Sequence, residues 1–436
     1  MFIKRLFIYL LLIFSFVLSQ KISYKSVGKL VRLKSGKSKY YNVRELQYGI
    51  FGVSCDEAII NKENTSFELM GNVSLWDTTR FIRSEKAILK SYKGKYRAFF
   101  SNGVTFDQDS INIRSKFARF SELNSRTIFS DSVILRYINP NLSLYCKNID
   151  VDTKSEYIIA KKVNNLVYMD STYRGEAITN QIEYDVKGNL LTMPKRVKIE
   201  FNEHSLGSVD FKKLTHKELN SIQLKTLPYL KLMAKKGSYN FKTNNPYLKG
   251  DVKIFHIDSL GKKTTLFCDT LIGKSSRSKV YFNGNFSIFN DSLSISGKKS
   301  ALDYKENILK VLKSPSLKFK GNLAVGDSCY IKFSNKKSIE SVTIYGDSKI
   351  SNPIENTYLT NEIKGKYIKI FFEENKPSFL QVNKEAICVY FKPEKGKSDY
   401  KKNIISGDTL KVIFEESILS SIQVLGGVRG EYIIGK

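Results

Sequence analysis

The feature that most constrains the fold of this chain is an internal repeat with a period of about 30 residues. Its template is VSCDEA at 53–58: apolar, any, small, charged, any, and then apolar or small. Successive small positions lie 29, 31 and 31 residues apart, and a later series has intervals of 29, 29, 39 and 42 residues. The small position is held by Cys55, Ser84, Ser115, Cys146, Cys268, Gly297, Gly326, Gly365 and Gly407. A fixed period of this length is typical of a repeat architecture.

A second element keeps step with the first, and in it Gly, Asn or Asp comes just before an apolar residue. Examples are GNVSL at 71–75, NGVTF at 102–106 and GNFSI at 284–288, with the apolar residue about 18 positions after the small residue. Gly, Asn and Asp are the residues that turns prefer. We therefore expect two short strands in each unit, with turn chemistry at these pairs ending one strand before the next begins.

Alternation of apolar and polar residues supports strands. IKIFFEE at 368–374 and LKVIFEE at 410–416 place β-branched and aromatic residues at two-residue spacing. Helical periodicity is nearly absent, and the exception is DFKKLTHKELNSIQL at 210–224, which could form one amphipathic face. Because this stretch lies where the repeat is weakest, at 165–230, it is either an insertion or a join between two stacks.

A unit of about 30 residues cannot bury its own apolar face, but stacked units can share one core. The sequence therefore predicts an all-β fold, an elongated open β-jellyroll or β-solenoid-like stack of two-strand repeats, lengthening to 39–42 residues near the C-terminus. The predicted organisation is a signal peptide at 1–19, a lead-in strand or linker at 20–47, a first repeat segment at 48–200, an irregular or helical insertion or join at 201–230, and a second repeat segment at 231–436.

The N-terminus, MFIKRLFIYLLLIFSFVLSQ, indicates export. Lys4 and Arg5 precede an apolar run at 6–18, and Val17-Leu18-Ser19 fits the small-x-small cleavage pattern. The run is short for a membrane span, so we expect cleavage and a periplasmic protein, with an uncleaved anchor as the alternative. The net charge of +29 suits an anionic partner, although coding bias towards Lys could supply much of it. Nucleic acid is disfavoured by the export signal.

Catalytic patterns are missing from the sequence. The three histidines form no metal-binding motif, the five cysteines form no CxxC pair, and there is neither a GxSxG nor a Gly-rich phosphate loop. Paired carboxylates occur at 373–374 and 415–416, at matched repeat positions, which favours a structural role over glycosidic chemistry. We expect a protein that is not an enzyme, with no catalytic residue, metal or cofactor.

Cys55 could be a reactive thiol or one small residue of a strand. Its column also holds Ser and Gly, so the position requires a small side chain rather than thiol chemistry. The next column holds Asp56, Glu85 and Lys116, so the sign of the charge is not fixed, which suits a solvated position.

The repeat resembles the OstA/LptA family of periplasmic lipopolysaccharide-transport proteins, including the LptA-like and LptD N-terminal-like β-jellyroll domains. The matching stretches are VSCDEAII with MGNVSL, IRSEKA with NGVTF, and ISGDTLKVIF with IQVLGGVRGEY. The resemblance covers most of 48–165 and 230–434. The chain departs from the family in its extra length, in the region 165–230, and in having Cys, Ser or Gly where Ala is usual.

The resemblance implies a twisted, open jellyroll whose apolar groove holds the acyl chains of lipopolysaccharide, or a related anionic glycolipid, on its way from inner to outer membrane. It also implies LptC-like inner-membrane and LptD-like outer-membrane partners, and end-to-end self-association by strand addition. The short apolar run and the repeat continuing to the last residue favour an LptA-like bridge over an LptC-like or LptD-like protein. The groove would be lined by Val53, Cys55, Val73, Leu75, Ile82, Val104, Phe106, Ile113, Val133, Leu135, Val252, Ile254, Phe286 and Ile288.

Two alternatives stay open. The same apolar residues could fill a closed core without touching lipid. The whole chain could also be an exported β-solenoid scaffold with a structural or adhesive role. An open apolar trough between the sheet walls would favour transport, and a filled core with a polar exterior would favour a scaffold.

Overall fold

The computed structural model describes residues 23–48, 51–92, 95–137, 141–169, 173–204, 224–258, 260–290, 293–319, 321–334, 338–354, 357–373, 376–393, 400–415 and 418–435. The signal peptide predicted at 1–19 lies outside these ranges. So does nearly all of the helix considered at 210–224, of which only Leu224 is described, as the first residue of a strand.

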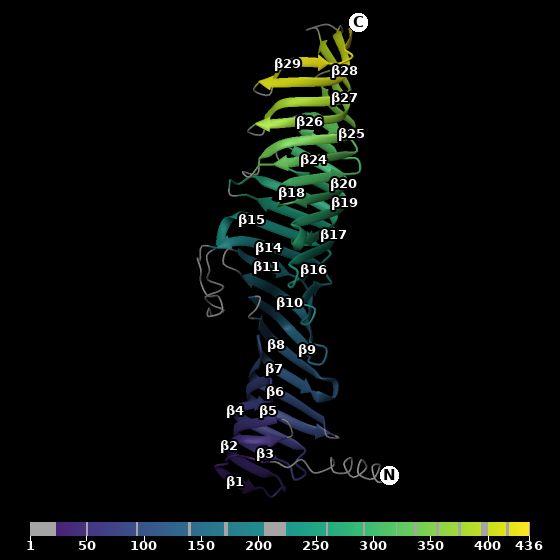
Figure 1. Cartoon of the computed structure of the whole chain (residues 1–436). Helices are drawn as coiled ribbons and strands as arrows, with labels where there is room; N and C mark the ends of the chain where they lie inside the picture. Colours follow the sequence, from purple (N-terminus) through teal and green to yellow (C-terminus); the bar gives the residue numbers. More distant parts are fainter. Residues whose placement is uncertain are drawn as a thin grey trace, which may run out of the picture. The chain divides into compact units, whose positions relative to one another are not determined.

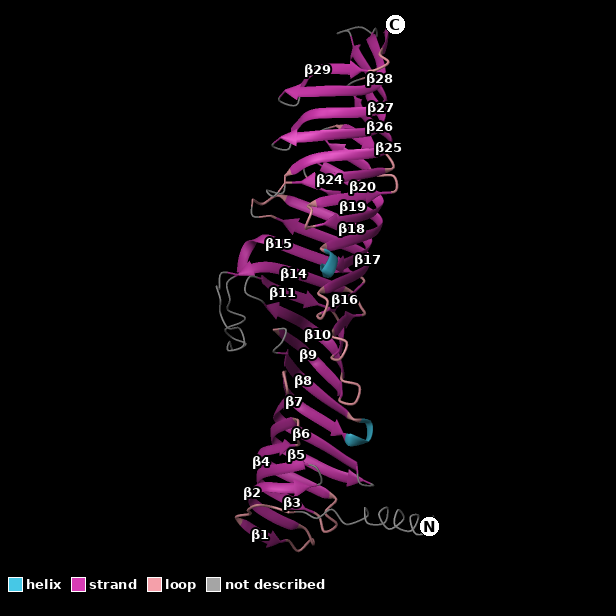
Figure 2. Cartoon of the chain, viewed as in Figure 1, coloured by secondary structure: helices cyan, strands magenta, loops and turns pink. Residues whose placement is uncertain are grey.

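By its internal contacts the chain divides into two compact units. Among the described residues, unit 1 comprises 23–169 and 176–187, and unit 2 comprises 173–175, 188–204 and 224–435. Over these ranges the regular structure is strand, apart from two single-turn 3-10 helices, η2 (Glu122–Asn124) and η3 (Ser275–Arg277) (Figure 2). The predicted all-β fold is confirmed.

Sequential antiparallel pairing organises unit 1. Its strands are β1 (Lys29–Arg32), β2 (Ser38–Tyr48), β3 (Phe51–Ile60), β4 (Ser66–Trp76), β5 (Arg80–Tyr92), β6 (Lys95–Gln108), β7 (Ile111–Ser121), β8 (Arg126–Tyr137), β9 (Leu142–Asp152), β10 (Tyr157–Met169) and β12 (Gln181–Asp185). Each strand from β2 to β9 pairs with the strand before it and the strand after it. A repeat of about 30 residues therefore holds two neighbouring strands (Figure 1).

Unit 2 has the same antiparallel order with several shorter strands. They are β13 (Leu190–Met193), β14 (Val197–His204), β15 (Leu224–Ala234), β16 (Lys236–Asn240), β17 (Asn245–Ile257), β18 (Lys263–Lys274), β19 (Lys279–Phe289), β20 (Leu293–Asp303), β21 (Ile308–Leu312), β22 (Ser316–Phe319), β23 (Asn322–Val325), β24 (Ser328–Phe333), β25 (Ile339–Pro353), β26 (Thr360–Glu373), β27 (Lys376–Pro393), β28 (Tyr400–Glu415), β29 (Ile418–Leu425) and β30 (Arg429–Gly435). β11 (Tyr173–Ile178) contributes residues to both units. The described ends of the insertion predicted at 201–230 belong to β14 and β15, which pair with each other.

The Gly/Asn/Asp pairs do not end strands, and this corrects the expectation from the sequence. Gly71 and Asn72 lie inside β4, Asn102 and Gly103 inside β6, and Asp131 inside β8, all with φ between 45° and 84°. The pairing register shifts at each of these points, as a β-bulge requires. Bulges and turns favour the same residues because both need positive φ, so the sequence pattern looked like a turn.

The two halves of each bulged strand face each other across a core. In unit 1, Phe106 follows the bulge of β6 and Phe129 precedes that of β8, yet their ring centroids lie 5.4 Å apart. Phe51 of β3 likewise meets Phe120 of β7 at 5.8 Å. Since β3 and β7 are not neighbours in the pairing order, these contacts must cross the interior between two walls.

In unit 2 the pairing itself separates the two walls. The second half of β20 continues through β21 and β24 to the first half of β25, and we call this wall A. The first half of β20 continues through β22 and β23 to the second half of β25, and we call this wall B. Long strands from β25 to β28, of 14 to 18 residues, then cross both walls (Figure 1). Their length accounts for the longer repeats near the C-terminus.

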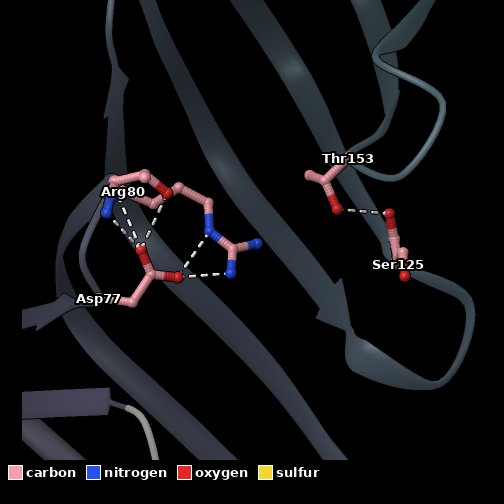
Figure 3. Close-up of polar contacts among 5 residues, drawn as sticks. Asp77, Arg80, Ser125 and Thr153 are labelled. Carbon is pink, nitrogen blue, oxygen red and sulfur yellow. Dashed lines mark hydrogen bonds and ion pairs between the residues drawn. The ribbon is translucent and has the colours of Figure 1, made fainter.

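Polar contacts fix the turns at the edges of unit 1. In the turn between β4 and β5, Asp77 accepts hydrogen bonds from the backbone N–H of Arg80 at 2.8 Å and from its Nε at 2.7 Å (Figure 3). Thr153 donates its hydroxyl to the carbonyl oxygen of Ser125 at 2.9 Å, which ties the end of β9 to the start of β8. The Arg80 guanidinium also lies 5.4 Å from the centre of the Phe120 ring. The turn between β4 and β5 therefore covers the edge of the core.

Candidate functional site: an apolar hollow between the sheet walls

Most of the residues predicted to line a groove lie at or near the bulge of a strand, where the strand bends from one wall to the other. We call this bend the corner. Twelve of the fourteen are buried, with 0–7% of their surface exposed, and Ile254 and Ile288 are half-buried. The buried ones are Val53, Cys55, Val73, Leu75, Ile82, Val104, Phe106, Ile113, Val133, Leu135, Val252 and Phe286. Whether any of them contacts a lipid stays a prediction.

Apolar and small residues form a ladder at this corner. The residue after each bulge lies directly opposite the small residue of the next strand. The pairs are Val73 with Ser84, Val104 with Ser115, Val133 with Cys146, Val252 with Cys268, and Phe286 with Gly297. The two sequence elements are therefore two sides of one structural position.

The small column needs small side chains because the next strand packs over it. A Cβ added to Gly365 would lie 2.3 Å from Cγ1 of Val382, and one added to Gly407 would lie 2.6 Å from Cγ1 of Val424. Burial raises the pKa of the Cys55 thiol to about 12, so its thiolate is scarce at neutral pH. Both observations support a limit on side-chain size at this column, which stays a prediction.

The charged column lies on the outer side of the same bulges. Asp56 accepts a hydrogen bond from Nδ2 of Asn72 at 2.8 Å. Where the column holds Lys116 instead, the bulge supplies Asp131, and their charged atoms are 3.2 Å apart. The charge in this column can be negative or positive because the bulge residue opposite it also differs from repeat to repeat.

The space between the walls is filled in unit 1. Tyr48 and Phe67 lie 4.1 Å apart between ring centroids, and Tyr96 meets Tyr48 at 5.0 Å. Phe100 and Phe129 have no exposed surface. Rings from both walls interlock here, so the described part of this core has the character of a packed interior.

In unit 2 an apolar hollow of about 480 Å³ lies between the walls. Wall A contributes Ile370, Leu380 and Val412, whereas wall B contributes Leu317, Ala324, Ile350 and Cys388. Half-buried apolar residues line its mouth: Phe319, Phe372, Pro377, Phe414 and Ile422. The volume falls within the range of about 300–1,000 Å³ that is usual for ligand pockets.

Polar groups border this hollow on wall B. Asn352 donates to Asn322 at 2.8 Å, and the side-chain oxygen of Asn361 accepts from the backbone of Phe391 at 2.8 Å. Glu362 forms ion pairs with Lys349 and Lys364. Hydrogen bonds from these two lysines hold the pKa of Glu362 below its usual range, so it stays ionised at neutral pH. The border is polar and charged while the interior is apolar, an arrangement that suits an amphipathic ligand.

A larger hollow of about 780 Å³ lies elsewhere in unit 2 and has a different character. Six of its eleven lining residues carry charged or amide groups, among them Lys235 and Asp251, which form an ion pair at 2.9 Å, and the other five are apolar or small. Of the predicted groove residues only Val252 borders it. The charged groups spread through its lining make it a poorer place for an alkyl chain than the hollow between the walls.

None of the fourteen predicted residues lines the apolar hollow. Its residues nevertheless had a signal in the sequence, because Ile370 and Phe372 come from IKIFFEE, and Val412 and Phe414 from LKVIFEE. Choosing alternate apolar positions from these two stretches would have found them. The prediction instead followed the repeat columns, which mark the corners of the walls.

Within the described ranges, no cluster of three or more His, Cys, Asp or Glu side chains is placed to hold a metal ion. In the same part of the chain no helix has the length and hydropathy needed to cross a membrane. The carboxylate Glu373 lies at the end of β26, and the side chains of 374, 415 and 416 are not described.

Comparison with solved structures gives a partial structural likeness. No family model and no curated protein matches the chain. The chain is similar to the solved structure of LptH, the LptA-homologous periplasmic component of the conserved lipopolysaccharide transport device from Pseudomonas aeruginosa. The match has 12% sequence identity and a TM-score of 0.26, and covers 33% of this chain and 95% of that one.

Proposed function

We propose that this chain is a periplasmic carrier that shields the acyl chains of lipopolysaccharide, or of a related anionic glycolipid, and passes the lipid from inner to outer membrane. The observation that carries the proposal is the hollow of about 480 Å³ in unit 2, which is apolar inside, open at half-buried aromatic residues and polar at its border. Removing alkyl surface from water stabilises a bound lipid by roughly 0.8 kcal/mol per buried CH₂ group. No catalytic step is part of this role.

Charge and repeat pattern support the same proposal. The net charge of +29 favours an anionic headgroup over a neutral one. The register of small and apolar columns is the pattern by which the sequence resembles the OstA/LptA family. An export signal at 1–19 would place the protein in the periplasm, where such a carrier works.

The partners would be an LptC-like component at the inner membrane and an LptD-like component at the outer membrane. Open strand edges would join them. β29 and β30 both pair with β28. Among the described residues, neither strand pairs with any further strand. Tyr432 and Ile434 are more than half exposed on β30. A strand from a partner or from a second copy could extend the sheet at this edge.

The alternative role, an exported β-solenoid scaffold, is favoured by unit 1. Its predicted groove residues are 0–7% exposed, and aromatic rings fill the space between its walls. A scaffold needs a filled core and no hollow, so the two roles differ in what they require of unit 2.

Filling the hollow tests the proposal. Ala324→Phe places a ring where Ala324 of wall B is 3% exposed and borders the hollow. We expect glycolipid co-purified per protein, measured by mass spectrometry, to fall severalfold. The matched control is Ala301→Phe, since Ala301 pairs with Lys310 on the outer side of wall A and should leave the lipid content unchanged. Wild-type protein free of lipid after mild extraction from its own cells would contradict the carrier role.

A further inference from the structure

A third hollow, of about 470 Å³, lies on the outer face of unit 1 across β5, β6, β7 and β8. Four exposed cationic residues line it, one from each strand: Lys90, Arg97, Arg119 and Arg126. The pairing register holds them together, because Lys90 lies opposite Arg97 and the neighbouring row joins Phe99 to Arg119. Adjacent strands are about 4.8 Å apart, so the cations span about 14 Å.

Carboxylates are kept to the borders of this surface. Arg126 is paired with Asp150, with Nε and Oδ1 3.0 Å apart. Over the described residues, Lys90, Arg97 and Arg119 have no ion pair. The two rows that line the hollow, Lys90–Arg97–Ser121–Arg126 and Ile88–Phe99–Arg119–Ile128, contain no acidic residue. A concave surface with three uncompensated cations will attract an anion.

Apolar surface is exposed among these cations. Phe99 is 36% exposed and stacks on Phe117, with ring centroids 6.1 Å apart and planes 19° from parallel. Ile128, two strands away, is 41% exposed. A flat, rigid ring beside guanidinium groups suits a ligand that has an apolar face as well as negative charges. Sugar rings present C–H faces, and acidic groups on them can form the paired hydrogen bonds that Arg prefers.

We propose that this outer hollow binds an anionic saccharide, a glycan that carries acidic groups on neighbouring sugars. Arg97 and Arg119 bind the acidic groups, and Phe99 packs against a sugar ring between them. The site is separate from the apolar hollow of unit 2 and needs no alkyl chain, so it stands or falls independently of the lipid-carrier role.

Charge reversal with a matched control tests the electrostatic part. The probe is a short dextran sulfate, with neutral dextran of equal length beside it, titrated by calorimetry at physiological salt. We expect the sulfated chain alone to bind, and Arg97→Glu with Arg119→Glu to weaken it about tenfold or more. The control is Arg83→Glu with Arg114→Glu, which makes the same charge change on exposed residues. These two residues precede the bulges of β5 and β7, so they lie on the opposite wall of unit 1 from the hollow. Equal weakening by both pairs would mean diffuse attraction and would overturn the site.

Phe99→Ala tests whether the ligand is a saccharide. This variant keeps all four cations, so a peptide polyanion such as poly-glutamate should bind it as it binds the wild type. We expect the affinity for dextran sulfate to fall about threefold to tenfold through loss of the ring contact. Tighter binding of poly-glutamate than of dextran sulfate by the wild type, or no effect of Phe99→Ala on dextran sulfate, would rule out the saccharide and indicate an acidic peptide. A thermal melt of each variant checks that these exposed positions leave the fold intact.

Discussion

Unit 1 and unit 2 have the same corner ladder but differ in the space between their walls. Of the six aromatic side chains that are fully buried among the described residues, five lie in unit 1, and only Phe286 lies in unit 2. The unit 1 rings are Tyr48, Phe67, Phe100, Phe106 and Phe129. Around the hollow of unit 2, the deep positions are held by smaller side chains such as Ala324, Leu380 and Val412.

The difference shows that the repeat determines how the walls form but not whether side chains fill the space between them. Small and apolar columns fix the bend of each strand in both units. Side-chain volume at the mid-wall positions then decides whether the walls touch or leave a hollow. At the edge of unit 1, Arg80 also lies over Phe120 and covers the core. The same fold can therefore enclose a filled core in one unit and leave an apolar hollow in the other.

The largest contrast should come from removing one ring from each unit. Phe100→Ala in unit 1 leaves a cavity in a packed core and should cost about 3–5 kcal/mol of unfolding free energy. Phe372→Ala in unit 2 removes a half-buried ring at the mouth of the hollow and should cost about 1 kcal/mol. Urea unfolding followed by circular dichroism measures both. Similar losses for the two variants would show that unit 2 is as tightly packed as unit 1.

The corner ladder should be equally sensitive in both units. Gly365→Ala puts a methyl group 2.3 Å from Val382, and should cost about 1–3 kcal/mol. Ser115→Val, at the same column of unit 1, should cost a similar amount. Gly430→Ala is the control, because a Cβ there meets no atom within 4 Å. Thermal unfolding compares the three, and a harmless Gly365→Ala would remove the steric reason for the small column.

Acid should weaken the turn between β4 and β5, which covers the edge of the core of unit 1. Burial raises the pKa of Asp77, but hydrogen bonds from Arg80 and from backbone N–H groups outweigh it and hold the pKa below its usual range. The ionised carboxylate therefore stabilises the fold above the ordinary pKa of about 3.9, and this contribution is lost as pH falls through the folded-state pKa. Asp77→Asn should cost about 1 kcal/mol at pH 7. Urea midpoints of variant and wild type should converge below about pH 4; a constant gap from pH 7 to pH 3 would argue against this assignment.

The smallest effect is expected for Cys55→Ala. Ala keeps the position small and apolar, so the loss in unfolding free energy should stay below about 1 kcal/mol. Lipid content should not change, since the raised pKa of this thiol leaves it unreactive. Unfolding and lipid analysis of the same sample measure both, and a severe loss of either would restore a chemical role for the thiol.

Much of the fold could be predicted from the sequence, because the constraints that shape it are local. The column of Cys55, Ser84 and Gly365 exposes the size limit at the bend, and alternation exposes the strands. The bulges were misread because residues such as Asn72 take positive φ in bulges and turns alike.

The hollow could not be predicted in the same way. Alternation shows that Ile370 and Val412 point inward, but not whether side chains of the opposite wall reach them. That depends on volumes contributed by strands distant in sequence, such as Ala324 of β23. Patterns within one strand contain no such information.

Photocrosslinking tests the central claim most directly, that the hollow of unit 2, and not the filled core of unit 1, holds alkyl chains. A photoreactive phenylalanine analogue replaces Phe372 or Phe414 at the hollow, and Phe100 or Phe106 in the core, and the chains are irradiated in cells. We predict glycolipid adducts at the two hollow positions and none at the two core positions. Adducts at the core positions alone, or at none of the four in folded protein, would contradict it.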